Sequence, residues 1–285
     1  MGVVRAFIPV VSKAYDREVF QTGRIPMTTE TQANSGKKIA LITGGSRGIG
    51  RSAVLALAER GVGSILTYNS NQAEAEKVVA LATEAGVPAI ALQLDASQPA
   101  SFADFAGRVK VALGELGAER FDYLVNNAGI SSTATLANGT EAELDAQFAV
   151  HFKGVFLLTQ ELLPLINDGG RIVNISSGLA RFAMNGRAIY GPMKAAVEAL
   201  TRYMAVELGP RGISANVVAP GAIATDFSGG MVRDNPEVNK AVASHTALGR
   251  VGLPQDVGTV IAGILSDEFG WVNAQRIEVS GGIHI

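Results

Sequence analysis

The 285-residue chain contains no cysteine, one tryptophan and three histidines. The absence of cysteine excludes disulfide bonds, thiolate zinc sites and a cysteine nucleophile. It also suits the reducing cytoplasm, where we expect the protein to act. Positive charge is not in excess, because 24 Lys and Arg accompany 26 Asp and Glu, so binding to nucleic-acid phosphates is not expected. No apolar run reaches the ~18 residues of a membrane-spanning helix, so a membrane partner is not expected either.

Hydrophobic residues make up 47% of the chain, which is enough for a large core and excludes a wholly disordered protein. Short apolar runs predict strands at 38–43, 64–68, 89–93, 123–126, 171–175, 214–218 and 276–279. Segments with helical spacing predict helices at 49–60, 72–85, 97–113, 141–165, 190–208 and 254–265. This alternation predicts a single doubly wound α/β domain of the Rossmann type, with a mostly parallel seven-stranded sheet and helices on both faces.

Residues 1–36 do not follow the alternation, and we expect them to form an N-terminal extension to a domain at 37–285. They mix apolar and charged residues without a period, and no cleavage site follows residues 3–11, so a secretory signal is not expected. Met27 precedes a polar run that leads into the first strand. We therefore expect residues 1–26 to be a disordered tail, or sequence upstream of a natural start at Met27. Within the domain, an irregular insert is expected at about 222–250.

A glycine-rich turn joins the first predicted strand to the first helix. It reads Thr43-Gly44-Gly45-Ser46-Arg47-Gly48-Ile49-Gly50, with Gly-x3-Gly-x-Gly spacing. Glycine allows a sharp turn and close approach of a phosphate to the backbone, and the following helix N-terminus supplies free N–H groups. The turn therefore predicts a nucleotide site, although tight turns use glycine for steric reasons alone.

The end of the second predicted strand indicates which dinucleotide binds. Use of NAD is usually signalled there by an acidic residue that bonds the ribose hydroxyls. Residues 67–71, which include Asn69, contain no carboxylate. Arg47, inside the glycine turn, can pair with a 2′-phosphate, or it can be a solvated surface charge. Together the missing acid and the present base predict a preference for NADP(H) over NAD(H).

Tyr190 and Lys194 form a second motif, because a spacing of four places both side chains on one helix face. A nearby ammonium favours tyrosinate, so we expect Lys194 to lower the pKa of Tyr190 and make it a general acid. The alternative is an exposed helix pair. Ser176 and Ser177 follow the strand at 171–175 and so place a hydroxyl at the carboxyl end of the sheet, where open α/β sheets bind ligands.

In the order and spacing of these motifs, residues 38–282 resemble the classical short-chain dehydrogenases/reductases. Asp95 resembles the family's adenine-contacting Asp, and residues 126–129 match its NNAG segment. Ser177 lies thirteen residues before Tyr190, as the family's catalytic serine does, and residues 220–225 resemble its nicotinamide-side segment. The glycine-rich turn and the end of the second predicted strand look most like those of bacterial NADP-dependent 3-oxoacyl-carrier-protein reductases.

The resemblance implies an oxidoreductase that interconverts a ketone or oxoacyl group and a secondary alcohol by hydride transfer. Ser177 would orient the carbonyl, Tyr190 would donate the proton, and Lys194 would contact the nicotinamide ribose. The implied cofactor-binding residues are Gly44, Ser46, Arg47, Gly48, Ile49, Gly50, Asn69, Asp95, Ala96, Asn126, Ala128, Gly129, Tyr190, Lys194, Gly221, Ile223 and Thr225. The resemblance also implies a homotetramer, with the helices at 141–165 and 190–208 in one interface.

His151 breaks the family pattern, because the family usually has an Asn at this place in an Asn-x-x-Gly segment. Here the segment reads His151-Phe152-Lys153-Gly154. The Asn helps to hold a water behind the lysine, so we expect His151 to act in the proton relay as a neutral hydrogen-bonding bridge behind Lys194. The alternative is that His151 is only a packed helix residue.

Other features leave alternatives open. His245 and His284 have no acidic partner at metal-ligand spacing, so no metal site is expected. Residues 226–230 are glycine-rich and apolar and are either a lid over the substrate or a plain loop. A catalytically silent dinucleotide-binding regulator, and dehydratase or epimerase chemistry on the same scaffold, are the rival functions.

Overall fold

A computed structural model describes residues 37–285 of the chain. The predictions of an N-terminal extension and of a start at Met27 lie outside the described residues. The strands are β1 (Ile39–Ile42), β2 (Gly63–Tyr68), β3 (Ala89–Gln93), β4 (Phe121–Asn126), β5 (Ile166–Ile175), β6 (Ser214–Pro220) and β7 (Arg276–Val279). They form one sheet in the order β3-β2-β1-β4-β5-β6-β7, and every pairing is parallel. This confirms the predicted Rossmann-type sheet.

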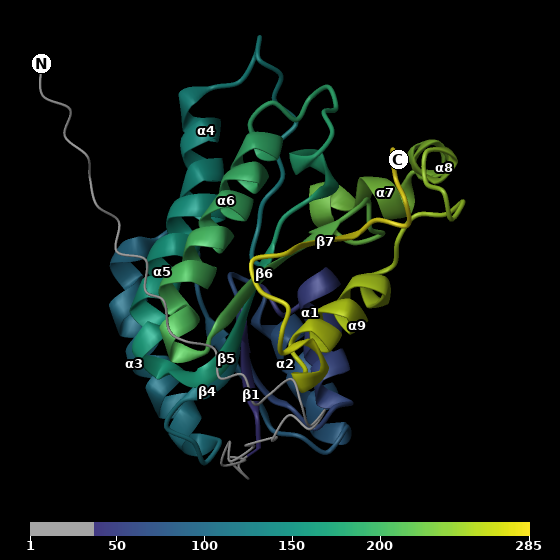
Figure 1. Cartoon of the computed structure of the whole chain (residues 1–285). Coiled ribbons are helices and arrows are strands. Elements are labelled where there is room, and N and C mark those ends of the chain that lie inside the picture. The colour runs from purple at the N-terminus through teal and green to yellow at the C-terminus, as the bar shows by residue number, and fades with distance from the viewer. Residues whose placement is uncertain (1–36) are drawn as a thin grey trace, which may run out of the picture. The chain divides into compact units, whose positions relative to one another are not determined.

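Helices cover both faces of the sheet, as Figure 1 shows, with α1, α2 and α9 on one face and α3, α5 and α6 on the other. The helices are α1 (Gly48–Ala58), α2 (Gln72–Glu84), α3 (Phe102–Glu115), α4 (Glu141–Phe148), α5 (Gly154–Leu162), α6 (Tyr190–Leu208), α7 (Met231–Asp234), α8 (Pro236–Ser244) and α9 (Pro254–Ile264). Strand β1 is buried on both sides, with Ala40 and Ile42 in one core cluster and Ile39 and Leu41 in the other. A parallel strand enclosed in this way must be apolar throughout, which is why its sequence shows no alternation.

The helix predicted at 141–165 is not continuous. Between α4 and α5 the backbone forms a π-helical turn at Ala149–Lys153, and Leu163–Leu165 close the segment as a 3-10 turn. A π turn keeps the side chains at near-helical spacing, so the sequence pattern conceals it. Such turns occur often at functional sites, and this one contains His151.

Two further predictions about boundaries were wrong. Strand β5 begins at Ile166 rather than at 171, and its register with β4 shifts between Phe121 and Tyr123. The polar residues 167–170 therefore belong to an irregular strand and not to a loop. The insert at about 222–250 is not irregular throughout, because it contains α7 and α8. Asn235 caps α8 by accepting hydrogen bonds from the N–H groups of Glu237 (3.0 Å) and Val238 (3.1 Å).

Candidate active site

A cleft of about 1130 Å³ lies at the carboxyl ends of the strands. Its walls come from the turn after β1, the segment after β4, the ends of β5 and β6, and the insert that carries α7 and α8. The strand order reverses between β1 and β4, and an open α/β sheet binds ligands at that switch point. The volume slightly exceeds the range for a single small-molecule site, roughly 300–1,000 Å³, so the cleft has room for a cofactor and a substrate together.

The glycine-rich turn has the backbone shape that a phosphate site needs. Gly44 and Gly48 have φ angles of 64° and 55°, in the left-handed region that favours glycine. A Cβ on Gly50 would meet the Gly44 carbonyl oxygen at 2.2 Å, so only glycine lets α1 pack this closely against the turn. No side chain caps the N-terminus of α1, which leaves its N–H groups free to bind an anion.

Asn127 holds this turn in place, although it was not among the predicted site residues. Its Nδ2 donates hydrogen bonds to the carbonyl oxygens of Thr43 (2.8 Å) and Gly44 (3.0 Å). In return, the N–H groups of Asn127 (2.9 Å) and Ala128 (3.0 Å) donate to Thr43 Oγ1. These bonds tie the turn after β1 to the segment after β4. Its position inside the NNAG segment was the signal that could have identified it.

The far end of the cleft carries Arg47, Asn69 and Asp95. Arg47 is exposed and forms no ion pair within residues 37–285. Asp95 Oδ1 accepts hydrogen bonds from Ser97 N (2.9 Å) and Oγ (2.7 Å), so this carboxylate shapes its own turn. Glu74 is the other acid on this wall, and it pairs with Lys77 at 2.6 Å.

Most of the predicted site residues line this one cleft. They are Gly44, Ser46, Arg47, Gly48, Ile49, Asn69, Asp95, Ala96, Ala128, Gly129, Ser177, Tyr190, Lys194, Gly221, Ile223 and Thr225. Gly50, Asn126 and His151 do not line it. Gly50 instead provides the close approach of α1 described above.

The side chain of Asn126 is directed into the core rather than toward a cofactor. Its Nδ2 donates hydrogen bonds to Thr159 Oγ1 (3.1 Å) and Asn174 Oδ1 (2.8 Å), and all three groups are buried. The amide therefore links β4, α5 and β5. The expectation that Asn126 helps to hold the cofactor stays a prediction, and the described bonds of its side chain do not provide such a contact.

Ser177, Tyr190 and Lys194 come together on one wall of the cleft. Ser177 directly follows β5, and its Oγ accepts a hydrogen bond from Leu179 N (3.2 Å). Tyr190 is the first residue of α6 and Lys194 lies one turn later, and both side chains are buried. Lys194 Nζ lies 5.6 Å from the centre of the Tyr190 ring and donates a hydrogen bond to Ile175 O (2.9 Å).

Burial shifts the pKa values of Tyr190 and Lys194 in this wall. It raises the pKa of Tyr190 to about 12, and interaction with the Ser177 hydroxyl and the charge of Arg187 act in the opposite direction. Burial also lowers the pKa of Lys194 to about 7. Desolvation of the phenol outweighs the charges around it, so the pKa of Tyr190 lies above its usual value and not nearer to neutral; a lowering of this pKa by Lys194 stays a prediction. Tyr190 therefore keeps its proton at neutral pH, which suits a proton donor.

His151 projects from the π turn against the Tyr190 ring, with ring centres 5.4 Å apart and ring planes nearly perpendicular. Its Nε2 lies 2.8 Å from Ile130 O, and its buried Nδ1 has no hydrogen-bond partner among residues 37–285. Burial, followed by the Lys194 charge, lowers the pKa of His151 to about 3. The imidazole is therefore neutral at physiological pH, as expected. Its place in a proton relay stays a prediction.

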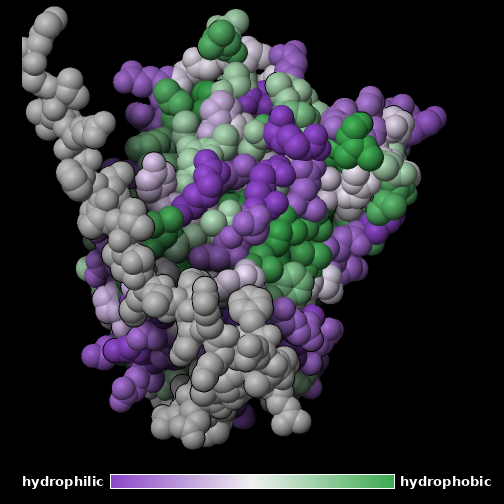
Figure 2. Space-filling view, viewed as in Figure 1, coloured by the Kyte–Doolittle hydropathy of each residue, from purple (hydrophilic) through white to green (hydrophobic). Residues whose placement is uncertain are grey.

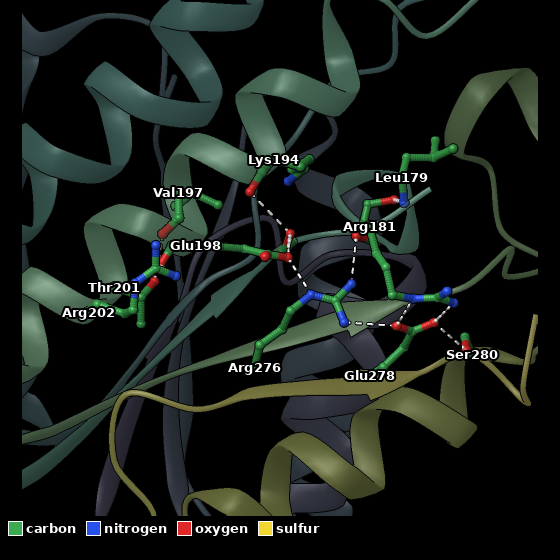
Figure 3. Close-up of polar contacts among 12 residues, drawn as sticks. Leu179, Arg181, Lys194, Val197, Glu198, Thr201, Arg202, Arg276, Glu278 and Ser280 are labelled. Atoms are coloured by element: carbon green, nitrogen blue, oxygen red, sulfur yellow. Dashed lines mark hydrogen bonds and ion pairs between the residues drawn. The ribbon is translucent and has the colours of Figure 1, made fainter. Parts of the chain in front are cut away.

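A network of charges behind Ser177 was missed by the sequence analysis. Ser176 Oγ donates a hydrogen bond to Glu198 (2.7 Å), and Arg276 donates to both Glu198 and Glu278 (2.8 Å each). Arg181 pairs with both carboxylate oxygens of Glu278 (2.7 and 2.8 Å), as Figure 3 shows. The network connects the end of β5 to α6 and β7. Its members are far apart in the sequence, so no local pattern indicates it.

The remaining histidines and the helices give two further findings. The rings of His245 and His284 lie 5.0 Å apart. Within residues 37–285, no group of three or more His, Cys, Asp or Glu side chains is arranged to hold a metal ion. None of the helices in this part of the chain has the length and apolar character needed to cross a bilayer.

Comparison with known proteins adds independent evidence to the geometry of the site. Residues 44–284 match a family model described as enoyl-(acyl carrier protein) reductase. A short-chain type dehydrogenase/reductase of Picea abies is 38% identical over 87% of this chain and 92% of its own length. The tetrahydroxynaphthalene reductase PfmaG of Pestalotiopsis fici is 35% identical over 92% of this chain and 96% of its own. The structure of the angucycline C-6 ketoreductase LanV with bound NADP matches with a TM-score of 0.82 and 32% identity, over 86% of this chain and 95% of that one.

These matches extend over nearly the whole of the described domain and include both the glycine-rich turn and the wall of Ser177, Tyr190 and Lys194. The chain is therefore an NAD(P)-dependent oxidoreductase that acts on CH–OH groups and belongs to the short-chain dehydrogenase/reductase family.

Proposed function

We propose that the protein is an NADPH-dependent ketone reductase in which Tyr190 is the acid. The observation that carries the proposal is the convergence of Ser177, Tyr190 and Lys194 on one wall of a cleft whose opposite end is the glycine-rich turn. A hydroxyl that orients a carbonyl and a phenol that holds its proton at neutral pH are the groups that reduction of a ketone requires.

The cleft fits a dinucleotide. The uncapped N-terminus of α1 and the left-handed glycines form a cradle for the pyrophosphate, and Gly44, Gly48 and Ala128 would line it. Arg47 would bind the 2′-phosphate, which favours NADP(H) because residues 67–71 offer no carboxylate to the ribose. When bound, this cofactor supplies the hydride.

The chain's own residues do the rest of the chemistry. Ser177 Oγ donates a hydrogen bond to the substrate carbonyl and fixes its orientation. Tyr190 then gives its proton to the alkoxide that forms. Lys194, held by Ile175 O at 2.9 Å, becomes cationic near neutral pH and stabilises the tyrosinate that remains. His151 packs against the Tyr190 ring and would relay the proton that restores the phenol.

The substrate wall favours an apolar, planar ketone. Phe182, Met184, Phe227, Met231 and Ile283 line the cleft on the side of Tyr190, and the Phe227 and Tyr190 rings have centres 5.9 Å apart. Aromatic and methionine side chains suit flat aromatic surfaces. The similarity to a tetrahydroxynaphthalene reductase and an angucycline ketoreductase supports an aromatic or polycyclic ketone.

The proposed assembly is a homotetramer in the cytoplasm, with one interface formed by α4, α5 and α6. These helices expose large apolar side chains, namely Leu144, Phe148, Phe156, Tyr203 and Val206. In Figure 2 hydrophobic residues are visible among hydrophilic ones over the α4–α6 side of the domain. These exposed apolar side chains on neighbouring helices support an interface there.

A panel of ketones, oxoacyl thioesters and sugars, followed by the absorbance of NADPH, tests the function. We expect aromatic ketones to consume NADPH and to yield the secondary alcohol. Binding of NADPH without consumption by any member would favour a silent regulator. An altered product formed without net consumption of the cofactor would favour an epimerase or dehydratase.

A further inference from the structure

Arg187 is a cation on the substrate side of the cleft that neither the motifs nor the proposed chemistry uses. It lies three residues before Tyr190, in the turn that leads into α6. Its carbonyl oxygen accepts a hydrogen bond from Gly191 N (3.0 Å), which ties its backbone to the start of α6. This bond holds the backbone of Arg187 close to Tyr190.

The guanidinium of Arg187 is held by a contact outside α6. Its Nη1 donates a hydrogen bond to Ser132 O (2.6 Å), in the segment that follows β4. Arg47 and Arg187 are the two arginines among the residues lining the cleft, and neither forms an ion pair within residues 37–285. Arg181 and Arg276, in the network behind Ser177, pair with carboxylates instead. The cleft therefore has one unpaired guanidinium at each end.

A partly buried guanidinium with N–H groups to spare favours an anion, because its desolvation is not offset by a protein carboxylate. We propose that Arg187 binds an acidic group of the substrate, a carboxylate or an ionised phenol or enol, while the ketone lies at Ser177 and Tyr190. This proposal rests on the proposed ketone reduction, and it specifies that the protein acts on ketones that carry an acidic group. Arg47 would hold the cofactor phosphate, and Arg187 would hold the substrate anion.

The other charges around this position leave Arg187 available. Asp226 is paired with Arg233, and Glu143 accepts a hydrogen bond from Ser132 Oγ (2.6 Å). Asp145 of α4 also lines the cleft and is the charge that would repel an anionic substrate. The charge of Arg187 also opposes the rise in the Tyr190 pKa that burial causes.

Two pairs of ketones test the proposal, each matched in shape and different in charge. They are 4-acetylbenzoate with 4-acetylbenzamide, and 3-acetylbenzoate with 3-acetylbenzamide. The measurement is the acid-to-amide ratio of kcat/KM with saturating NADPH, for the wild type and for R187Q, R187K and D145N. We expect the ratio of the better pair to exceed one in the wild type and to fall about 10- to 100-fold in R187Q, the size of a lost charge-assisted hydrogen bond. It should fall less in R187K and should not fall in D145N, the matched removal of a charge of opposite sign.

Calorimetric titration of the NADP⁺-loaded protein with 4-acetylbenzoate gives a second readout that does not depend on turnover. Affinity should be lower in R187Q than in the wild type, while the circular dichroism spectrum and the melting temperature show that the variant folds. If R187Q and the wild type had the same acid-to-amide ratio of kcat/KM and the same affinity for 4-acetylbenzoate, the proposal would be overturned. Ketone reduction itself would not be affected by that result. A wild type that binds the acid through Arg187 and reduces no ketone would instead overturn the proposed function.

Discussion

The burial of His151 predicts how the free energy of unfolding changes as the pH falls. In the unfolded chain its imidazole binds a proton below about pH 6.5, whereas in the folded protein burial and the Lys194 charge lower its pKa to about 3. Between these values the unfolded state binds more protons, so the free energy of unfolding falls as the pH falls. From pH 6.5 to pH 5 this single residue should remove between about 1 and 2 kcal/mol, because the slope rises from half of 1.36 kcal/mol per pH unit at pH 6.5 toward the full value.

His151→Asn removes the titrating group and keeps an amide that can donate to Ile130 O. We expect its free energy of unfolding to change less between pH 6.5 and pH 5 than that of the wild type, by between about 1 and 2 kcal/mol. Lys194 does not obscure the difference, because its folded pKa of about 7 lies above this window.

The assay is urea unfolding at fixed protein concentration, followed by far-ultraviolet circular dichroism. The only tryptophan, Trp271, is 98% exposed and is a poor fluorescence probe of unfolding. If the free energy of unfolding changed equally with pH in the wild type and in His151→Asn, the claim that the buried imidazole is neutral would be refuted. His151→Leu, which cannot hydrogen-bond, should in addition slow the proton-dependent step and change the solvent deuterium isotope effect, with NADPH affinity unchanged.

Three further predictions concern the cofactor, the charge network and the N-terminal residues. Arg47→Ala should weaken NADPH binding about 10- to 100-fold in fluorescence titrations and leave NADH binding unchanged, and equal losses for both would contradict the 2′-phosphate contact. Arg181 and Arg276 lower the pKa of Glu278 from 4.5 to about 2, so the free energy of unfolding of the wild type should fall as the pH falls between these values. Glu278→Gln should lack this loss of stability, and an unaltered acid transition in the variant would argue against the network. A shortened chain that begins at Met27 should keep the melting temperature and turnover of the full chain, and a drop of several degrees would show that residues 1–26 stabilise the domain.

The strands and most helices could be predicted from the sequence because their signals are local. A strand buried on both faces, such as β1, must be a short apolar run, and glycines end the helices beside it. The glycine-rich turn and the Tyr190–Lys194 pair are also local, since backbone shape and helix spacing alone place them. The carboxyl ends of parallel strands then bring Ser177 to the same cleft.

The remaining features depend on contacts between distant segments. The π turn at Ala149–Lys153 preserves the helical pattern of the sequence and so leaves no trace in it. The buried role of Asn126 depends on Thr159 and Asn174, which come from α5 and β5. The raised pKa of Tyr190 depends on burial, which a spacing of four residues does not report. Sequence proximity alone therefore does not predict the net direction of a pKa shift.

The most direct test of ketone reduction with Tyr190 as the acid follows the transferred hydrogen. The protein is incubated with an aromatic ketone and NADPH deuterated at C4, in separate reactions for the two C4 positions, and the alcohol is analysed by mass spectrometry. One of the two reactions should place a single deuterium on the carbinol carbon, and Tyr190→Phe should lower the rate about 100-fold or more while NADPH still binds. Alcohol without deuterium in both reactions, or near-normal turnover by Tyr190→Phe, would contradict the account.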